Sequence, residues 1–130
     1  MFCKRKPRRA ELADFAAELS RDIAATVADW PEEVQALGEQ LETQADRLEA
    51  AVRVIEAADR NAGMREQLWP TIGLALGIEA LLSRADAVKA LEPDAYTRLE
   101  TEAVLVRSFL RALAERLDAA LFRSGPARQG

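Results

Sequence analysis

Residues 34–55 read VQALGEQLETQADRLEAAVRVI, and the spacing of their apolar side chains decides the fold class. A spacing of three and four residues places these side chains on one face of an α-helix, with polar or charged residues at most of the other positions. The stretch therefore predicts an amphipathic helix from Pro31 to about Arg60, followed by a stop signal at Asn61-Ala62-Gly63. The apolar positions are Val34, Leu37, Leu41, Ala45, Leu48, Val52 and Ile55.

The same periodicity recurs on both sides of this stretch. It predicts one helix from about Arg9 to Asp29, and another from Pro93 to the turn-forming Ser124-Gly125-Pro126. Pro31 and Pro93 suit the first positions of their helices, where a missing N–H group breaks no intrahelical hydrogen bond. No stretch alternates apolar and polar residues between turn signals, so β-strands are not expected.

The segment between these helices is the most apolar part of the chain. From Leu68 to Leu82 it is apolar nearly all round a helix, which predicts that the first half of a helix extending to about Leu91 is deeply buried. The segment is shorter than the roughly 20 residues that a membrane-spanning helix needs. Two interpretations of Pro70 stay open, since it either opens this helix or kinks a longer one that begins near Met64.

Four amphipathic helices joined by short connections predict an all-α protein, an antiparallel four-helix bundle with up-down-up-down topology. Helices that follow one another closely run in opposite directions, and their four apolar faces then share one core. A dimer of helical hairpins is the alternative arrangement. We expect one domain over residues 9–123, between a flexible basic arm (residues 1–8) and a flexible tail (residues 124–130).

Positive charge is concentrated at the start of a chain whose formal net charge is −4. The first nine residues carry +5, residues 10–62 are strongly acidic, and residues 63–130 are balanced. Such an arm has the composition of a segment that binds nucleic-acid phosphates or an anionic membrane surface, and also that of a simple solubilising tail. The cations are Lys4, Arg5, Lys6, Arg8 and Arg9.

The residue types that most catalytic and metal sites need are missing. The chain has no histidine and a single cysteine, Cys3, which excludes Ser-His-Asp and Cys-His arrangements, the di-iron sites of helical bundles and zinc sites. It also has no glycine-rich phosphate loop. We therefore expect no enzyme, no cofactor, no metal and no small-molecule substrate. The lone cysteine, and an N-terminal segment without the apolar core of a signal peptide, favour the cytoplasm.

Glu79 is the one acidic residue within the apolar segment. A buried carboxylate needs a positively charged partner, and Arg107 and Arg111 are candidates one turn apart on the last helix. The sequence therefore predicts an internal ion pair, unless Glu79 occupies the solvent-facing strip of its helix. An enzyme that acts through Glu79 and these arginines is the remaining catalytic alternative.

Several other residues have both a packing and a binding interpretation. Trp30 and Trp69, each followed by a proline, either plug the ends of the bundle or anchor a partner. Gly73 and Gly77 form a Gly-x-x-x-Gly spacing that favours tight packing against a neighbouring helix, with dimerisation as the alternative. Gln44 is either a residue at the edge of the core or a polar residue that fixes the helix register.

These observations together predict a small non-catalytic interaction protein, an adaptor, chaperone or regulatory subunit, that binds a protein partner or forms a homo-oligomer. The candidate partner-binding residues are the cations of the basic arm together with Trp30 and Trp69. The alternative is an accessory protein that the arm tethers weakly to nucleic acid or to a membrane surface.

Overall fold

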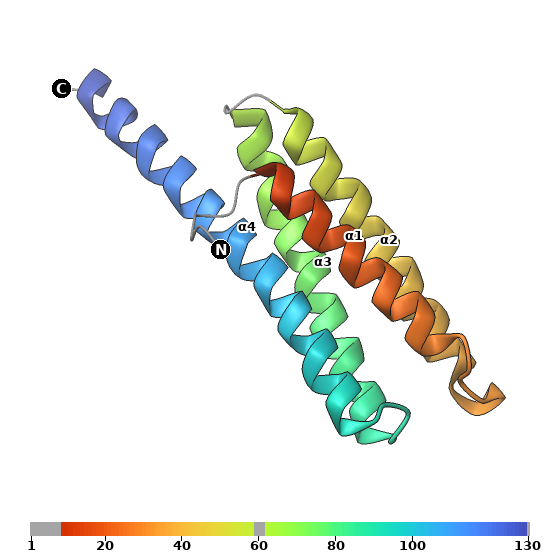
Figure 1. The fold of residues 1–130 in the computed structure, drawn as a ribbon. Coiled ribbons are helices and arrows are strands. Elements are labelled where there is room, and N and C mark those ends of the chain that lie inside the picture. The colour runs from red at the N-terminus through yellow and green to blue at the C-terminus, as the bar shows by residue number, and fades with distance from the viewer. Residues whose placement is uncertain (1–8, 59–61, 130) are drawn as a thin grey trace, which may run out of the picture.

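The structure is a computed structural model that describes residues 9–58 and 62–129, with the side chains of 11–58 and 63–120. This described part consists of helices and short connections and contains no strand. Its elements are α1 (Arg9–Val27), a 3₁₀ turn η1 (Glu32–Val34), α2 (Gln35–Ala57), α3 (Ala62–Ala87) and α4 (Pro93–Gln129) (Figure 1).

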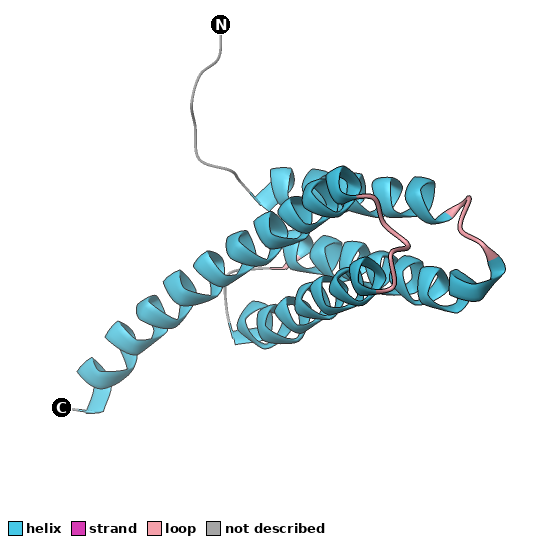
Figure 2. Ribbon diagram, turned by 90° about the horizontal axis from the view of Figure 1, so that it is seen from below, coloured by secondary structure: helices cyan, strands magenta, loops and turns pink. Residues whose placement is uncertain are grey.

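The four helices form a bundle in which each runs antiparallel to the next. α2 packs against α1 and α3, and α4 packs against α3 and, over a smaller interface, against α1. The α1–α2 and α3–α4 connections lie at the same end of the bundle, whereas α2 ends and α3 begins at the other end (Figures 1 and 2). The predicted four-helix bundle is therefore confirmed.

The core is built from the apolar positions that the periodicity marks. In α2 the fully buried side chains are Leu41, Ala45, Leu48, Val52 and Ile55. The other helices contribute similar stripes, and burial of each large aliphatic side chain contributes about 1.5–3 kcal/mol to folding. The largest of those side chains are Leu12, Leu19, Ile23, Met64, Leu68, Ile78, Leu82, Leu99 and Leu110.

The connection between α1 and α2 is longer than the sequence predicts and contains a 3₁₀ turn. α1 ends at Val27 rather than Asp29, and the amide of Trp30 donates a hydrogen bond of 3.1 Å to the Val27 carbonyl. Pro31 is extended, with φ −66° and ψ 163°, and precedes the 3₁₀ turn instead of being the first residue of a helix. Its carbonyl accepts the Val34 amide at 3.0 Å, so Pro31 caps the turn.

α3 is longer at its N-terminus than the predicted stop signal allows. Ala62 and Gly63 belong to the helix, whereas residues 59–61 lie outside the described residues. Met64 and Leu68 are completely buried one turn apart, and their burial outweighs the weak helix propensity of Gly63.

Pro70 lies inside α3, so the longer of the two predicted helices is the one that forms. Proline has no N–H group to donate to the carbonyl of Glu66, but Pro70 is exposed and this break falls on the solvent side of the helix. Leu68 and Thr71, on either side of the proline, are both buried. The Thr71 hydroxyl donates to the Gln67 carbonyl at 2.7 Å, which supports the backbone beside the break.

α3 ends at Ala87, earlier than the predicted Leu91, in a turn that contains no glycine. Lys89 has a φ of 64° and is the only residue other than glycine with a positive φ among the described residues. The Ala90 amide bonds to the Ala85 carbonyl at 2.9 Å, and the Lys89 amide bonds to the Asp86 carbonyl at 3.0 Å. This pattern is a Schellman motif, a helix end that glycine usually makes.

α4 begins at Pro93 as predicted but does not end at Ser124-Gly125-Pro126. Its backbone is helical to Gln129, whereas the sequence predicts a loose tail from residue 124. Extension of a helix that has already formed costs less than formation of a new one. With 37 residues α4 is the longest helix, and its C-terminal turns extend beyond the ends of the other three (Figures 1 and 2).

Candidate protein-binding surface

The side of α3 that points away from the core is exposed and apolar. Trp69 is 44% exposed and Leu76 is 48% exposed, on a helix whose other side is completely buried at Ala75 and Ile78. The predicted deep burial of this segment is therefore wrong for one side of the helix. Among the described residues, α3 is in contact with α2 and α4 alone, so the side of α3 opposite the core has no neighbouring helix there.

This surface carries no charge over most of its length. Every exposed residue of α3 from position 69 to position 83 is uncharged, and together they form the α3 outer face: Trp69, Pro70, Gly73, Leu76, Ala80 and Ser83. Exposed charged residues lie at its two ends along the helix, Arg65 and Glu66 before Trp69 and Arg84 after Ser83. In contrast, α1 exposes Asp14, Glu18 and Arg21 within a similar length. An uncharged exposed face of this kind is typical of an interaction site.

The two glycines of the Gly-x-x-x-Gly spacing have different surroundings. A Cβ atom built on Gly77 would lie 2.5 Å from Nε2 of Gln44, so this glycine leaves room for the Gln44 side chain, which is half-buried at the edge of the core. A Cβ atom on Gly73 would meet no described atom within 4 Å outside its own helix. Packing against a neighbouring helix therefore accounts for Gly77 but not for Gly73.

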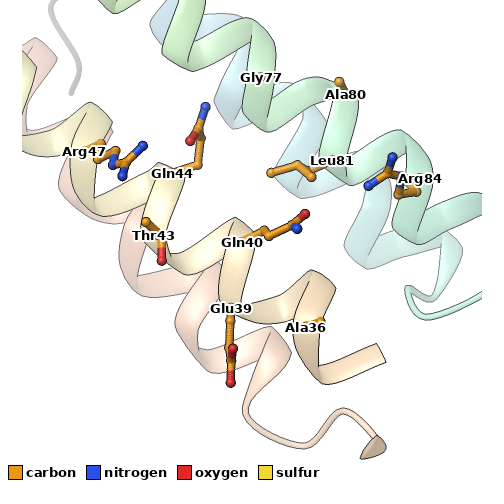
Figure 3. A pocket seen from close by; sticks show the side chains of 10 residues that line it. All are labelled: Ala36, Glu39, Gln40, Thr43, Gln44, Arg47, Gly77, Ala80, Leu81 and Arg84. Atoms are coloured by element: carbon orange, nitrogen blue, oxygen red, sulfur yellow. The ribbon is translucent and has the colours of Figure 1, made fainter. Parts of the chain in front are cut away.

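A shallow groove of about 680 Å³ runs beside the outer face, between α2 and α3. Figure 3 shows Gln44 reaching from α2 toward α3, and Gln40 facing Leu81 across the groove. Arg47 of α2 and Arg84 of α3 also line it. The groove thus adds polar hydrogen-bonding groups along one edge of an apolar surface, which resembles the polar rim of a protein interface.

The two tryptophans occupy different environments. Trp30 is 8% exposed, and a Cβ atom built on Gly38 would lie 3.3 Å from its Cε3 atom and 3.2 Å from Cβ of Val27. The indole therefore closes the α1–α2 end of the bundle against a glycine of α2 and is not available to a partner. Of the two predicted tryptophan anchors, only Trp69 lies on the surface.

Glu79 points toward α4 and lies outside the α3 outer face. Its carboxylate accepts two hydrogen bonds from the Arg107 guanidinium, 2.5 Å from Nε and 3.3 Å from Nη2, and both side chains are about one-fifth exposed. The bonds to Glu79 raise the pKa of Arg107. Arg111, the other predicted partner, lies instead 3.6 Å from Glu115 of its own helix. The Glu79–Arg107 pair joins α3 to α4, as does the ion pair between Arg65 and Asp118.

A cluster of carboxylates lies between α1 and α4, where the sequence pattern did not indicate one. Glu18, Asp22 and Glu102 bring carboxylate oxygens within 4.8 Å of one another, and among the described residues this is the only group whose geometry could hold a metal ion. Burial raises the pKa of Glu102 to about 7, and its hydrogen bond to Asp22 and the nearby negative charges act in the same direction. Glu102 is therefore about half protonated at pH 7, and its proton reduces the repulsion between the carboxylates.

Only one of the five cations of the basic arm belongs to the part of the chain that the structure describes. Lys4, Arg5, Lys6 and Arg8 lie outside the described residues, and Arg9 is the first residue of α1. Leu76 and the groove residues were not among the predicted partner-binding residues, although the absence of charge along one side of residues 69–83 was a signal that could have revealed them.

The described helices include none that combines the length and the apolar character needed to cross a membrane. Comparisons of the chain with protein-family models, with curated proteins and with solved structures found no match.

Proposed function

We propose that this chain is a small non-catalytic interaction protein, an adaptor, chaperone or regulatory subunit of the cytoplasm, that binds a protein partner or a second copy of itself through the α3 outer face. The observation that carries the proposal is the exposure of Trp69 and Leu76 on a helix face without charge. Tryptophan is enriched among the residues that dominate binding energy at protein interfaces. Burial of each large apolar side chain by a partner would contribute about 1.5–3 kcal/mol.

The ionisable residues support a binding role over a catalytic one. Glu79, the strongest catalytic candidate in the sequence, is paired with Arg107 between two helices and does not line the groove between α2 and α3. The groove between α2 and α3 is lined mainly by amide, guanidinium and small apolar groups. These groups can form hydrogen bonds at the rim of an interface, and they include no pair of acid and base that is poised for proton transfer.

Affinity purification of the tagged full-length chain from cells tests this proposal. Purification at low and at high salt is followed by mass spectrometry and by the ratio of absorbance at 260 and 280 nm. Three variants are compared with the unchanged chain: Leu76→Glu on the α3 outer face, Leu105→Glu on α4 as a matched control, and a chain without residues 1–8. Leu105 is 44% exposed, so both leucine substitutions place a charge at a similarly accessible position.

The proposal predicts a protein partner that resists high salt, is lost with Leu76→Glu, and is kept both with Leu105→Glu and without the arm. The sequence also carries a second candidate function in its basic arm. Nucleic acid or lipid that co-purifies at low salt, and is lost at high salt or with removal of residues 1–8, would support an electrostatic tether instead. Retention of every partner by Leu76→Glu would contradict binding through α3.

A further inference from the structure

The α3 outer face lies between two exposed residues of opposite charge that are symmetrically placed. Glu66 and Arg84 are 18 residues apart, which is about five turns of an α-helix, so both project from the same side of α3. Ala75 lies midway between them along the helix. The residues of the α3 outer face between the two charges are apolar or small. Gln67 is also exposed but projects from a different side of the helix, and Glu79 in this span is paired with Arg107 of α4.

We propose that the partner of the α3 outer face is a second copy of this chain, whose α3 packs antiparallel on the first about a twofold axis that crosses the outer face at the level of Ala75 along the helix. The inference rests on the proposed function and specifies its partner. In this arrangement Glu66 of each copy faces Arg84 of the other, so two pairs of opposite charge flank an apolar contact. A parallel arrangement would place Glu66 on Glu66 and Arg84 on Arg84, which is unfavourable.

The sizes of the side chains are complementary about the same axis. Trp69 of one copy falls opposite the interval between Ala80 and Ser83 of the other, where the side chains are small. Leu76 falls near the axis, so the Leu76 side chains of the two copies meet there, with Gly73 of each copy close by. The large Trp69 thus meets small side chains, and the two leucines form an apolar contact at the centre, which favours close packing of two helices.

Gly73 supports the approach of another backbone at this position. Glycine inside a helix costs about 1 kcal/mol relative to alanine. Gly73 has no positive φ to require it, and no described side chain of another helix needs the space that its missing Cβ atom leaves. A second helix passing close to Gly73 would use that space, whereas the isolated chain does not.

The expected dimer is weak and reversible. The segment from Glu66 to Arg84 is about 27 Å long at 1.5 Å per residue. A single helix face of this length buries less than the roughly 1,200–2,000 Å² of a stable interface. The association should therefore become visible only at chain concentrations of about 10–100 μM.

Sedimentation velocity of the full-length chain over a concentration series tests the proposal. The unchanged chain should pass from monomer to dimer, and Leu76→Glu should remain monomeric at every concentration. Leu105→Glu, the matched control on α4, should dimerise like the unchanged chain. Circular dichroism of each variant checks that the helical fold is intact.

Charge reversal tests the antiparallel register. Glu66→Arg and Arg84→Glu should each weaken the dimer roughly tenfold, because each change turns both flanking pairs into repulsive ones. The double variant carrying both substitutions restores opposite charges across the axis and should return dimerisation to near the original strength. A parallel dimer would not show this rescue, since identical residues would still face each other.

Two results would overturn the proposal: a chain that stays monomeric above about 100 μM, or a dimer that neither Leu76→Glu nor the single charge reversals weaken. The first result leaves the proposed function standing if the same Leu76→Glu variant loses a different protein during affinity purification. If Leu76→Glu keeps both its self-association and all of its protein partners, the self-association proposal and the proposed function are both contradicted.

Discussion

At the scale of single residues, Lys89 carries a backbone conformation that suits glycine better than lysine. Its φ of 64° places the Cβ atom close to the following carbonyl, which costs roughly 1 kcal/mol. The two hydrogen bonds of the Schellman motif at the end of α3 hold the residue in this conformation. The connection between α3 and α4 is therefore formed against a local preference of the chain.

We predict that Lys89→Gly raises the free energy of unfolding by about 0.5–1 kcal/mol, because glycine adopts a positive φ without this penalty. Urea denaturation monitored by circular dichroism measures the change. Ala87→Gly is the matched control, since it places glycine in the last turn of the helix and should lower stability by a similar amount. A loss of stability in Lys89→Gly would show that the lysine side chain itself stabilises the turn.

The ion pair between Glu79 and Arg107 gives a second prediction at this scale. Arg107→Ala leaves a half-buried carboxylate without its two hydrogen bonds and should lower the free energy of unfolding by about 1–2 kcal/mol. Arg111→Ala removes only an exposed ion pair within one helix and should change the free energy of unfolding by less than about 0.5 kcal/mol. Equal losses in the two variants would contradict the assigned pairing.

The ion pair and the turn at Lys89 also show which local features can be predicted from the sequence and which cannot. The sequence marks Glu79 as an acid in need of a partner and places Arg107 and Arg111 within reach. The choice between the two arginines depends on the register of α3 against α4, which periodicity alone does not specify. The turn at Lys89 carries no signal at all, because glycine is the residue by which such turns are recognised.

At the scale of elements, the glycines of α2 and α3 serve different purposes. Gly38 allows α2 to approach the α1–α2 turn, because a Cβ atom there would press on Val27 and Trp30 at 3.2 and 3.3 Å. Gly73 faces open space instead. The same substitution should therefore have opposite effects in two neighbouring helices.

We predict that Gly38→Ala lowers the free energy of unfolding by about 1–3 kcal/mol, the usual range for overpacking a tight contact. Gly73→Ala should raise it by about 0.5–1 kcal/mol through the better helix propensity of alanine. Thermal unfolding at chain concentrations near 1 μM compares the two variants while the chain is monomeric. A destabilised Gly73→Ala would mean that the space beside this residue is already used within one molecule.

Helix periodicity locates all four helices but not the environment of each side. The stripe that continues through Leu68, Ala75 and Ile78 identifies the buried side of α3. The apolar residues on the opposite side look the same in a sequence, and their exposure becomes visible only when the other three helices are placed. A helix that is apolar on all sides is therefore expected to be buried, but the sequence does not show whether the same chain or another molecule buries each side.

At the scale of the whole molecule, the bundle is closed by the contact between its first and last helices, the smallest of its interfaces. The carboxylates of Glu18, Asp22 and Glu102 meet in this contact. Because burial raises the pKa of Glu102 to about 7, the folded chain holds a proton that the unfolded chain releases above pH about 4.5. Closure of the bundle should consequently depend on pH.

We predict that the free energy of unfolding falls as pH rises from about 4.5 to 7, because the folded state binds more protons than the unfolded state in this range. Glu102 contributes at most about 1.4 kcal/mol per pH unit, and less because the carboxylate is partly exposed to solvent. In Glu102→Gln the slope over this range should be smaller and stability at pH 8 higher. Urea denaturation at several pH values measures both, with Glu115→Gln, an exposed change on the same helix, as control.

The arrangement of the whole molecule follows from the sequence because short connections and four apolar stripes leave few ways to form one core. The acidic cluster does not follow, since Glu18 and Glu102 are far apart in the chain and meet only through the packing of α1 on α4. The α3 outer face is predictable only in part. The sequence shows that one side of residues 69–83 lacks charge, but only the packing of the four helices shows that this side is exposed.

The different positions of the two tryptophans give this chain two fluorescent reporters of separate events. Trp30 is enclosed at one end of the bundle, and Trp69 is exposed near the other end, where α3 begins. Emission from Trp30 should shift to longer wavelength only when the bundle unfolds. Emission from Trp69 should be quenched by added iodide in the folded monomer and be protected when another molecule covers α3. Two variants, each with one of the tryptophans replaced by phenylalanine, would therefore report folding and association separately.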